Sequence, residues 1–81
     1  MMVRVKFFAA LRERVGQGEV AVDIPEGSTV RDLWESLQKD HPRLPGAAMK
    51  LLYAVNKNYV NGDHVLKDKD EVVFVPPVSG G

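Results

Sequence analysis

Apolar and polar residues alternate along the first stretch of the chain, which is typical of a half-buried strand. In residues 2–8 every second side chain is apolar, so these side chains fall on one face. Residues 19–24 repeat the pattern, and Pro25 directly follows them as a break. Residues 9–15 lie between the two stretches and predict a short helix that ends at Gly16.

The apolar spacing then changes from two to about 3.6 residues, which predicts the main helix. Ser28 or Thr29 can cap this helix, and Thr29 with Asp32 has the spacing of a capping box. The apolar residues that follow recur at i, i+3, i+4 and i+7, which places them on one helix face. They are Val30, Leu33, Trp34 and Leu37. The pair His41-Pro42 ends the helix, because a residue that precedes proline disfavours the helical conformation.

Short strands fill most of the second half of the chain. Residues 51–55 predict a third strand, and a turn at 56–58 leads into a short strand at 59–60. A charged loop at 67–71 precedes the last strand at 72–75. The main elements are therefore strand, strand, helix, strand, short strand and strand.

This order predicts an α+β fold in which one main helix covers one face of a mixed sheet. A right-handed crossover places the later strands beside the first, as in the ubiquitin-like β-grasp. A ferredoxin-like sandwich is the alternative, but only one strong helix is visible. We expect a domain over residues 1–75 and an extended, flexible tail over 76–81. The expected core residues are Val3, Val5, Phe7, Val20, Val22, Ile24, Val30, Leu33, Leu37, Leu52 and Phe74.

Composition and charge narrow the classes of function. A chain of 81 residues forms one small domain, with little room for a large catalytic cleft. Its 11 Lys and Arg balance its 11 Asp and Glu, so no net positive field favours nucleic acid or an anionic membrane. The absence of cysteine excludes disulfides, thiolate metal sites and a Cys nucleophile. Without disulfides or a targeting segment, we expect a cytoplasmic protein.

The side chains most often found in catalytic sites show no spacing in this sequence that is typical of a catalytic or metal-binding site. His41 and His64 have no partner at metal-ligand spacing, so we expect no metal site. The acidic residues of 67–71 alternate with lysines and fit a solvated turn. The serines have no His or Asp arrangement that would activate them.

The C-terminal segment is the unusual feature of the sequence. It reads Pro76-Pro77-Val78-Ser79-Gly80-Gly81. The two prolines cannot donate to a sheet, and they favour an extended chain of roughly 20 Å reach. Two glycines fit a channel too narrow for other residues, and a terminal carboxylate is a usable nucleophile toward a nucleotide phosphate. The alternative is an ordinary frayed terminus.

The whole chain resembles the MoaD/ThiS family of ubiquitin-like sulfur carriers, and within it the small subunits of molybdopterin synthases. The motifs that carry the resemblance are Val5-Lys6-Phe7-Phe8-Ala9, Leu11-Arg12-Glu13, Ala54-Val55-Asn56, Leu66-Lys67-Asp68, Asp70-Glu71-Val72 and the segment from Phe74 to Gly81. Lys69 departs from the family, which often has glycine at that place. This departure affects the geometry of the turn.

The resemblance implies that the protein is a substrate-like, non-catalytic subunit of a transferase. Gly81 would be adenylated by an E1-like enzyme that uses ATP, and a sulfur-donating enzyme would then convert it to a thiocarboxylate. The tail would enter a large catalytic subunit, in a heterotetramer, and give its sulfur to a pterin precursor. Gly80 would be the neighbour that fits the channel. No bound cofactor is expected.

We expect the partners to bind exposed residues at the root of the tail and the tail residues that follow. These residues are Phe8, Tyr59, Val75, Pro76, Pro77, Val78 and Ser79. Three alternatives keep the carrier chemistry but change the acceptor: thiamine thiazole synthesis, tRNA thiolation and conjugation to lysine. A fourth alternative is a non-reactive ubiquitin-like interaction module.

Overall fold

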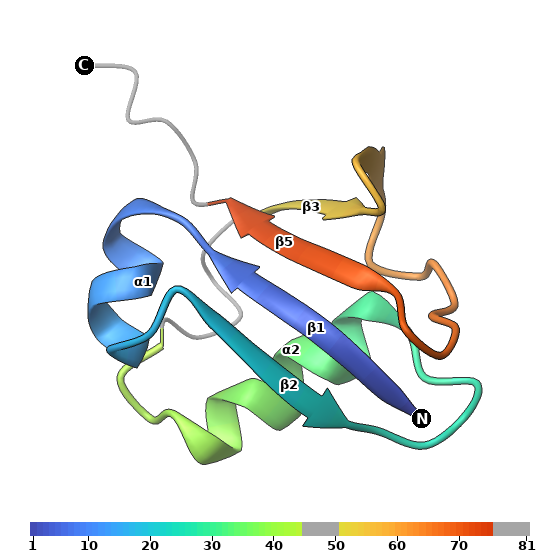
Figure 1. Ribbon diagram of the computed structural model, residues 1–81, viewed down its shortest axis with the longest axis horizontal. Coiled ribbons are helices and arrows are strands. Elements are labelled where there is room, and N and C mark those ends of the chain that lie inside the picture. Colours follow the sequence, from blue (N-terminus) through green and yellow to red (C-terminus); the bar gives the residue numbers. More distant parts are fainter. Residues whose placement is uncertain (45–50, 76–81) are drawn as a thin grey trace.

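The chain forms a five-stranded sheet with one long helix packed across one of its faces (Figure 1). The computed structural model describes residues 1–44 and 51–75, apart from the side chains of residues 9 and 10. The elements in chain order are β1 (Met2–Phe7), α1 (Ala9–Val15), β2 (Glu19–Asp23), α2 (Val30–Asp40), β3 (Leu52–Val55), β4 (Asn58–Val60) and β5 (Glu71–Val75).

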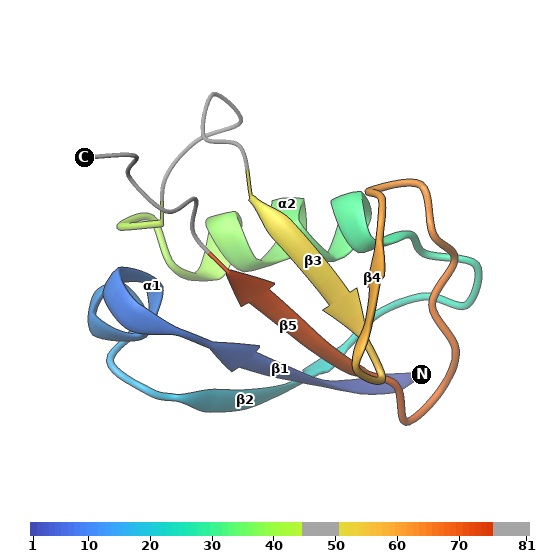
Figure 2. The same cartoon turned by 90° about the horizontal axis from the view of Figure 1, so that it is seen from above.

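The strand order is β2-β1-β5-β3-β4, with β1 and β5 parallel at the centre of the sheet. The other neighbouring strands pair antiparallel. Helix α2 crosses one face, and α1 lies at the end of the sheet where β1 stops (Figure 2). This arrangement confirms the predicted β-grasp and excludes the ferredoxin-like alternative.

The ends of α2 form as the sequence predicts. Thr29 is the N-cap: its Oγ1 accepts a hydrogen bond from Asp32 N at 3.2 Å, and its own N donates to Asp32 Oδ2 at 3.0 Å. This reciprocal pair satisfies two backbone donors that a helix start leaves unpaired. At the other end His41 is the C-cap, and its N donates to Leu37 O at 2.8 Å.

Phe74 on β5 lies at the centre of the buried core. Its ring centroid is 4.8 Å from that of Trp34, 5.6 Å from that of Tyr53 and 6.3 Å from that of Phe7. The predicted core residues that are buried are Val3, Val5, Phe7, Ile24, Val30, Leu33, Leu37 and Phe74. Further buried apolar residues are Leu11, Trp34, Leu44, Leu51, Val55, Leu66 and Val72.

Three predicted core positions differ from this outcome. Val20 and Val22 are only half-buried against the core, because β2 is an edge strand with a neighbour on one side. The prediction for Leu52 is wrong, since its side chain is 51% exposed. Tyr53 and Val55 supply the inward face of β3, so Leu52 lies on the opposite face by the period-two rule.

Each strand also differs from its expected bounds by one residue at one end, and two of these ends have a clear local cause. β1 ends at Phe7, and Phe8 is the extended N-cap residue of α1 instead of the last strand residue. The turn after β3 consists of Asn56 and Lys57, both with positive φ, so β4 begins at Asn58. Two positive-φ residues are what a tight two-residue hairpin requires.

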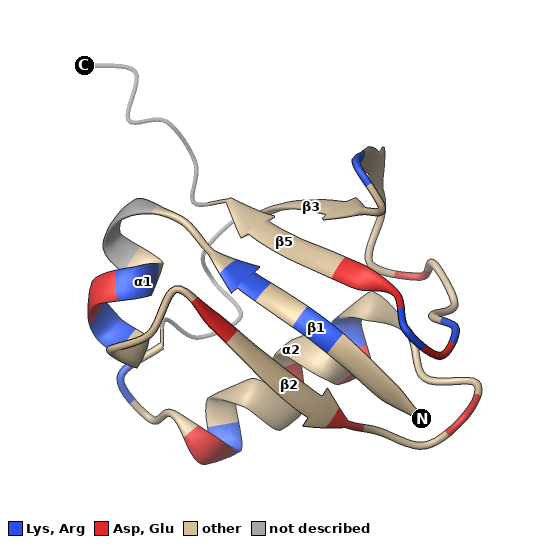
Figure 3. Ribbon diagram, viewed as in Figure 1, with Lys and Arg blue, Asp and Glu red and all other residues tan. Residues whose placement is uncertain are grey.

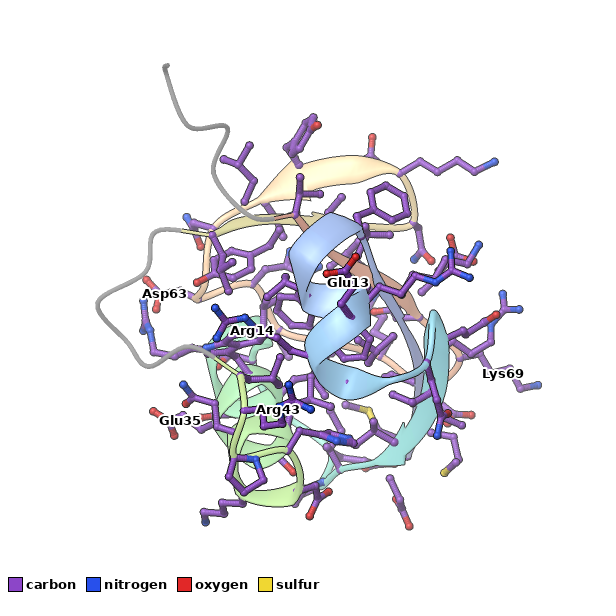
Figure 4. The ribbon with its side chains drawn as sticks, turned by 90° about the vertical axis from the view of Figure 1, so that its left-hand side faces the viewer. Glu13, Arg14, Glu35, Arg43, Asp63 and Lys69 are labelled. Carbon is purple, nitrogen blue, oxygen red and sulfur yellow. The ribbon has the colours of Figure 1, made fainter. Side chains whose placement is uncertain are left out.

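The region around α1 is also tied to the loop that follows α2. Arg14 Nη1 donates to the carbonyl oxygen of Arg43 at 3.0 Å, and Figure 4 shows the two side chains close together. No helix in the described part of the chain is long and apolar enough to cross a bilayer.

Candidate partner-binding surface

The face of the sheet that α2 leaves uncovered carries a cluster of apolar side chains. We call it the outer-face patch and define it as Phe8, Leu52, Tyr59, Val73 and Val75. Phe8 is 52% exposed, Leu52 51% and Tyr59 74%, while the two valines are half-buried. An exposed apolar cluster of this kind marks an interaction site more often than scattered single residues do.

Strand register brings these residues together. Leu52 pairs directly with Val75, and Ala54 of the same strand pairs with Val73 on one side and Tyr59 on the other. Phe7 pairs with Phe74, so the next residue, Phe8, follows the chain to a place beside Val75. The structure therefore unites the predicted positions Phe8, Tyr59 and Val75 on one surface.

Sequence reasoning missed Leu52 and Val73 as members of this patch. The signal for Val73 was present, because it has the same strand parity as Val75. Leu51 and Leu52 are both apolar, so alternation alone did not say which of them faces inward. The pairing of Tyr53 with Phe74 settles the parity of β3 and turns Leu52 outward.

An open groove of about 430 Å³ borders the patch at the β3–β4 end. Leu52 and Tyr59 belong to both the patch and the groove. The other lining residues are Leu51, Tyr53, Val60, Asn61 and Gly62. The lining is mainly apolar, which suits an apolar side chain of a partner better than a polar small molecule.

Charged residues border the patch on its β1 side (Figure 3). Glu71 Oε2 lies 3.4 Å from Arg4 Nη2 and 3.5 Å from Lys6 Nζ. Arg4 also approaches Glu19, with Nη1 3.9 Å from Oε1. Opposite charges on three neighbouring strands thus compensate one another beside the apolar surface.

The described residues show no catalytic or metal-binding cluster. No three His, Cys, Asp or Glu side chains gather among them in a way that could hold a metal ion. His41 caps α2, and the carbonyl of His64 accepts from Val30 N at 3.0 Å. Asp70 accepts from Lys67 N at 2.8 Å and from Asn56 Nδ2 at 2.9 Å, so its carboxylate organises the turn before β5.

β5 ends at Val75, inside the outer-face patch, and the chain continues from there into the tail. The predicted tail positions lie outside the described residues. They are Pro76, Pro77, Val78, Ser79, Gly80 and Gly81. The patch therefore surrounds the point at which the tail begins.

Comparison with known proteins gives this geometry its context. The model of the ThiS family matches residues 5–81. The chain belongs to the ThiS family. A family of β-grasp proteins agrees with the strand order and with the sequence resemblance described above.

Individual proteins are similar to this chain over nearly its full length. The molybdopterin synthase sulfur carrier subunit of Escherichia coli K12 is 46% identical, covering 99% of this chain and 100% of the relative. Among solved structures, a putative molybdopterin converting factor, subunit 1, from Pyrococcus furiosus has a TM-score of 0.82 and 38% identity, covering 96% of this chain and 99% of that one. The small archaeal modifier protein 1 of H. volcanii has a TM-score of 0.86 and 26% identity, with 95% and 98% coverage.

Proposed function

We propose that this chain is the sulfur carrier subunit of a molybdopterin synthase and that its reactive group is the carboxylate of Gly81. The observation that carries the proposal is the full-length 46% identity to a protein named for that role. The outer-face patch supports it, because a carrier must be gripped by other proteins while its tail enters their active sites.

The chemistry fits a chain without a catalytic cluster among its described residues. A carboxylate oxygen of Gly81 attacks the α-phosphate of ATP in an E1-like enzyme, and pyrophosphate leaves. A sulfur-donating enzyme then supplies sulfur at the hydrosulfide level, which forms a C–S bond with the acyl carbon of the adenylate, so that AMP leaves with the C–O bond broken and a thiocarboxylate remains. This form of sulfur storage needs no cysteine, and the chain has none. Because activation consumes ATP, we place the carrier in the cytoplasm.

The thiocarboxylate is then used inside a large catalytic subunit, which we expect to form a heterotetramer with this chain. The outer-face patch holds the domain against that subunit. The tail segment of six residues reaches roughly 20 Å beyond Val75, enough to enter a narrow channel. Its two terminal glycines carry no Cβ that would block the passage.

The decisive experiment is the intact mass of the protein after incubation with the activating enzyme, ATP and a sulfur source. We expect one oxygen to be replaced by one sulfur at the terminus. The modified protein is then mixed with the large subunit and the pterin precursor, and the mass is expected to return to its starting value as molybdopterin forms. An unchanged mass in the first step would make the chain a passive interaction module.

Conjugation to lysine is a second candidate function, and the similarity to a structure named as a modifier protein favours it. In that reaction a lysine amine displaces AMP from the same adenylate, and an isopeptide bond forms. The mass experiment separates the two functions when a mixture of acceptor proteins is included, because conjugation yields adducts heavier by a whole carrier chain.

A further inference from the structure

The free edge of β2 is a second surface with the properties of a binding site. β2 is the terminal strand of the sheet, and no described element lies along its open side (Figures 1 and 2). An edge strand presents backbone N–H and C=O groups that another strand can pair with. The outer-face patch lies on the other side of β1 and leaves this edge free.

The hydrogen bonds at the two ends of β2 fix which of its backbone groups are free. Phe7 N donates to Gly18 O at 3.0 Å, and Ile24 N donates to Met1 O at 2.9 Å. Each bond joins the pair of residues that extends the β1–β2 register by one step, at one end or the other. In an antiparallel pair, directly opposite residues alternate between hydrogen-bonded and non-hydrogen-bonded pairs.

This alternation determines the direction in which the backbone N–H and C=O groups of each β2 residue point. Val20 and Val22 direct their backbone groups toward β1. Glu19, Ala21 and Asp23 direct their N–H and C=O groups toward the open edge. At the opposite edge of the sheet, the same rule leaves only Tyr59 of the short strand β4 with outward-pointing N–H and C=O groups. β2 therefore offers more free backbone groups for strand pairing than β4 does.

Both sides of the β2 edge are suited to apolar side chains. On the α2 side, Val20 and Val22 are half-buried and remain partly accessible. On the outer side, a hollow of about 310 Å³ opens over β1 and β2. Its residues are Met2, Val3, Arg4, Ala21 and Lys69. Met2 is 47% exposed, and the small Ala21 leaves room beside it.

The charges along the edge select the partner. Glu19 and Asp23 flank Ala21, with side chains 47% and 79% exposed. Among the described residues, the ion pair of Glu19 is the 3.9 Å contact with Arg4, and Asp23 lies 3.2 Å from the N-terminal amino group of Met1. Two exposed carboxylates at alternate positions favour a partner with a basic residue opposite each of them.

The same charges disfavour a second copy of this chain as the strand that pairs with the β2 edge. Antiparallel self-pairing centred on Ala21 would place Glu19 opposite Asp23 at both ends, and like charges directly opposite each other are destabilising. Arg4 and Lys69 at the outer hollow also disfavour a cation at the middle position of the added strand. An apolar residue fits that position, against Met2 and Ala21.

We propose that the edge of β2 binds an extended segment of another protein, five residues long, with a basic residue at each end and three apolar residues between them. Its ends lie opposite Glu19 and Asp23, its middle residue over Ala21, and the other two against Val20 and Val22. The segment binds without displacing a subunit held at the outer-face patch.

Amide hydrogen exchange and NMR titration test this proposal on the full chain. In the free protein we expect slow exchange at Val20 and Val22 and fast exchange at Glu19, Ala21 and Asp23. The probe acetyl-KVLVK-amide is expected to slow exchange at Ala21 by about tenfold at saturation. The charge-reversed peptide acetyl-EVLVE-amide is expected to leave it unchanged.

Variants at the edge sharpen the test. Ala21→Pro removes an N–H that points away from β1, so we expect the fold to persist and peptide binding to be lost. Ala21→Ser keeps the N–H and is expected to bind. If Ala21→Pro fails to fold, the Glu19→Lys/Asp23→Lys double variant replaces it, and its preference is expected to switch to acetyl-EVLVE-amide.

Three results would overturn the proposal. They are equal binding of the two peptides, peptide-induced shifts confined to Phe8 and Tyr59, and no change at Ala21 up to millimolar peptide. Dimerisation of the free protein with protection at Ala21 would assign the edge to a second copy instead. Each readout is independent of sulfur transfer, so failure here leaves the proposed carrier function standing.

Discussion

At the scale of single residues, exposure separates the side chains that hold the fold from those available for binding. Phe7 and Phe8 are adjacent and chemically identical, yet Phe7 is 2% exposed and Phe8 is 52% exposed. Phe7 packs in the core against Phe74, and Phe8 lies on the outer-face patch. The two residues therefore contribute to different properties, stability and association.

Replacing Phe8 with alanine tests this division. Loss of an anchoring aromatic side chain typically costs about 2–4 kcal/mol of binding, or about 30-fold to 1,000-fold in Kd. We expect Phe8→Ala to weaken binding of the large subunit by this amount, measured by calorimetry, with little change in the melting temperature. Val65→Ala is the control, because Val65 is also 52% exposed but lies outside the patch. Unfolding of Phe8→Ala, or unchanged affinity, would contradict the assignment.

Lys69 is the second residue whose conformation makes a prediction. Its φ is +71°, in the left-handed region where a side chain costs roughly 1 kcal/mol and glycine does not. We expect Lys69→Gly to raise the free energy of unfolding by about 0.5–1 kcal/mol in urea denaturation, since a more flexible unfolded chain offsets part of the gain. Lys69→Ala keeps the strain and is the control. A gain of the same size in the alanine variant would attribute the effect to the lysine charge.

At the scale of elements, α2 stabilises the sheet through one apolar face. Leu37 is 1% exposed on this face. We expect Leu37→Ala to lower the free energy of unfolding by about 2–5 kcal/mol, through lost burial and the cavity left behind. Lys39→Ala, on the exposed side of the same helix, is expected to change it by less than about 0.5 kcal/mol. Equal effects of the two substitutions in thermal melting would show that the helix is oriented differently.

The sequence predicts an element well where its side-chain pattern has one interpretation. The apolar face of α2 and the reciprocal caps at Thr29 and Asp32 are local features, so they can be identified without knowing the rest of the fold. β3 is only four residues long and follows Leu51, so two phases of alternation are equally good. Contact with Phe74 on a distant strand selects the phase, and this information is not local to β3.

The candidate site was only partly predictable for the same reason. Phe8 and Val75 could be placed at the root of the tail from parity and the expected neighbours β1 and β5. The addition of Leu52 and Val73 required the register between β3 and β5. The unpaired backbone of β2 required both the strand order and the phase of its hydrogen bonds. Neither can be obtained from one strand alone.

At the scale of the whole molecule, the domain separates its proposed tasks in space. The outer-face patch lies over β5, β3 and β4 and beside the end of β1, whereas β2 borders the opposite side of the sheet. The tail that we propose to be reactive follows Val75 in the sequence, and Val75 belongs to the patch. A carrier built this way can be held by its domain while its terminus reacts, so the two properties can be altered one at a time.

This separation predicts opposite effects of changes at the tail and at the patch. Adding one alanine after Gly81 converts the reactive carboxyl into a peptide bond, so we expect the intact mass to show no sulfur loading. The affinity for the large subunit and the melting temperature are expected to stay near the wild-type values. Phe8→Ala is expected to weaken docking and to leave the chemistry intact. A thiocarboxylated sample of this variant still gives its sulfur to the precursor once the concentration of the large subunit exceeds the weakened Kd. Full sulfur loading of the extended variant would show that the reactive group is elsewhere. Failure of Phe8→Ala to recover at a saturating large subunit would show that the patch acts in transfer as well as in docking.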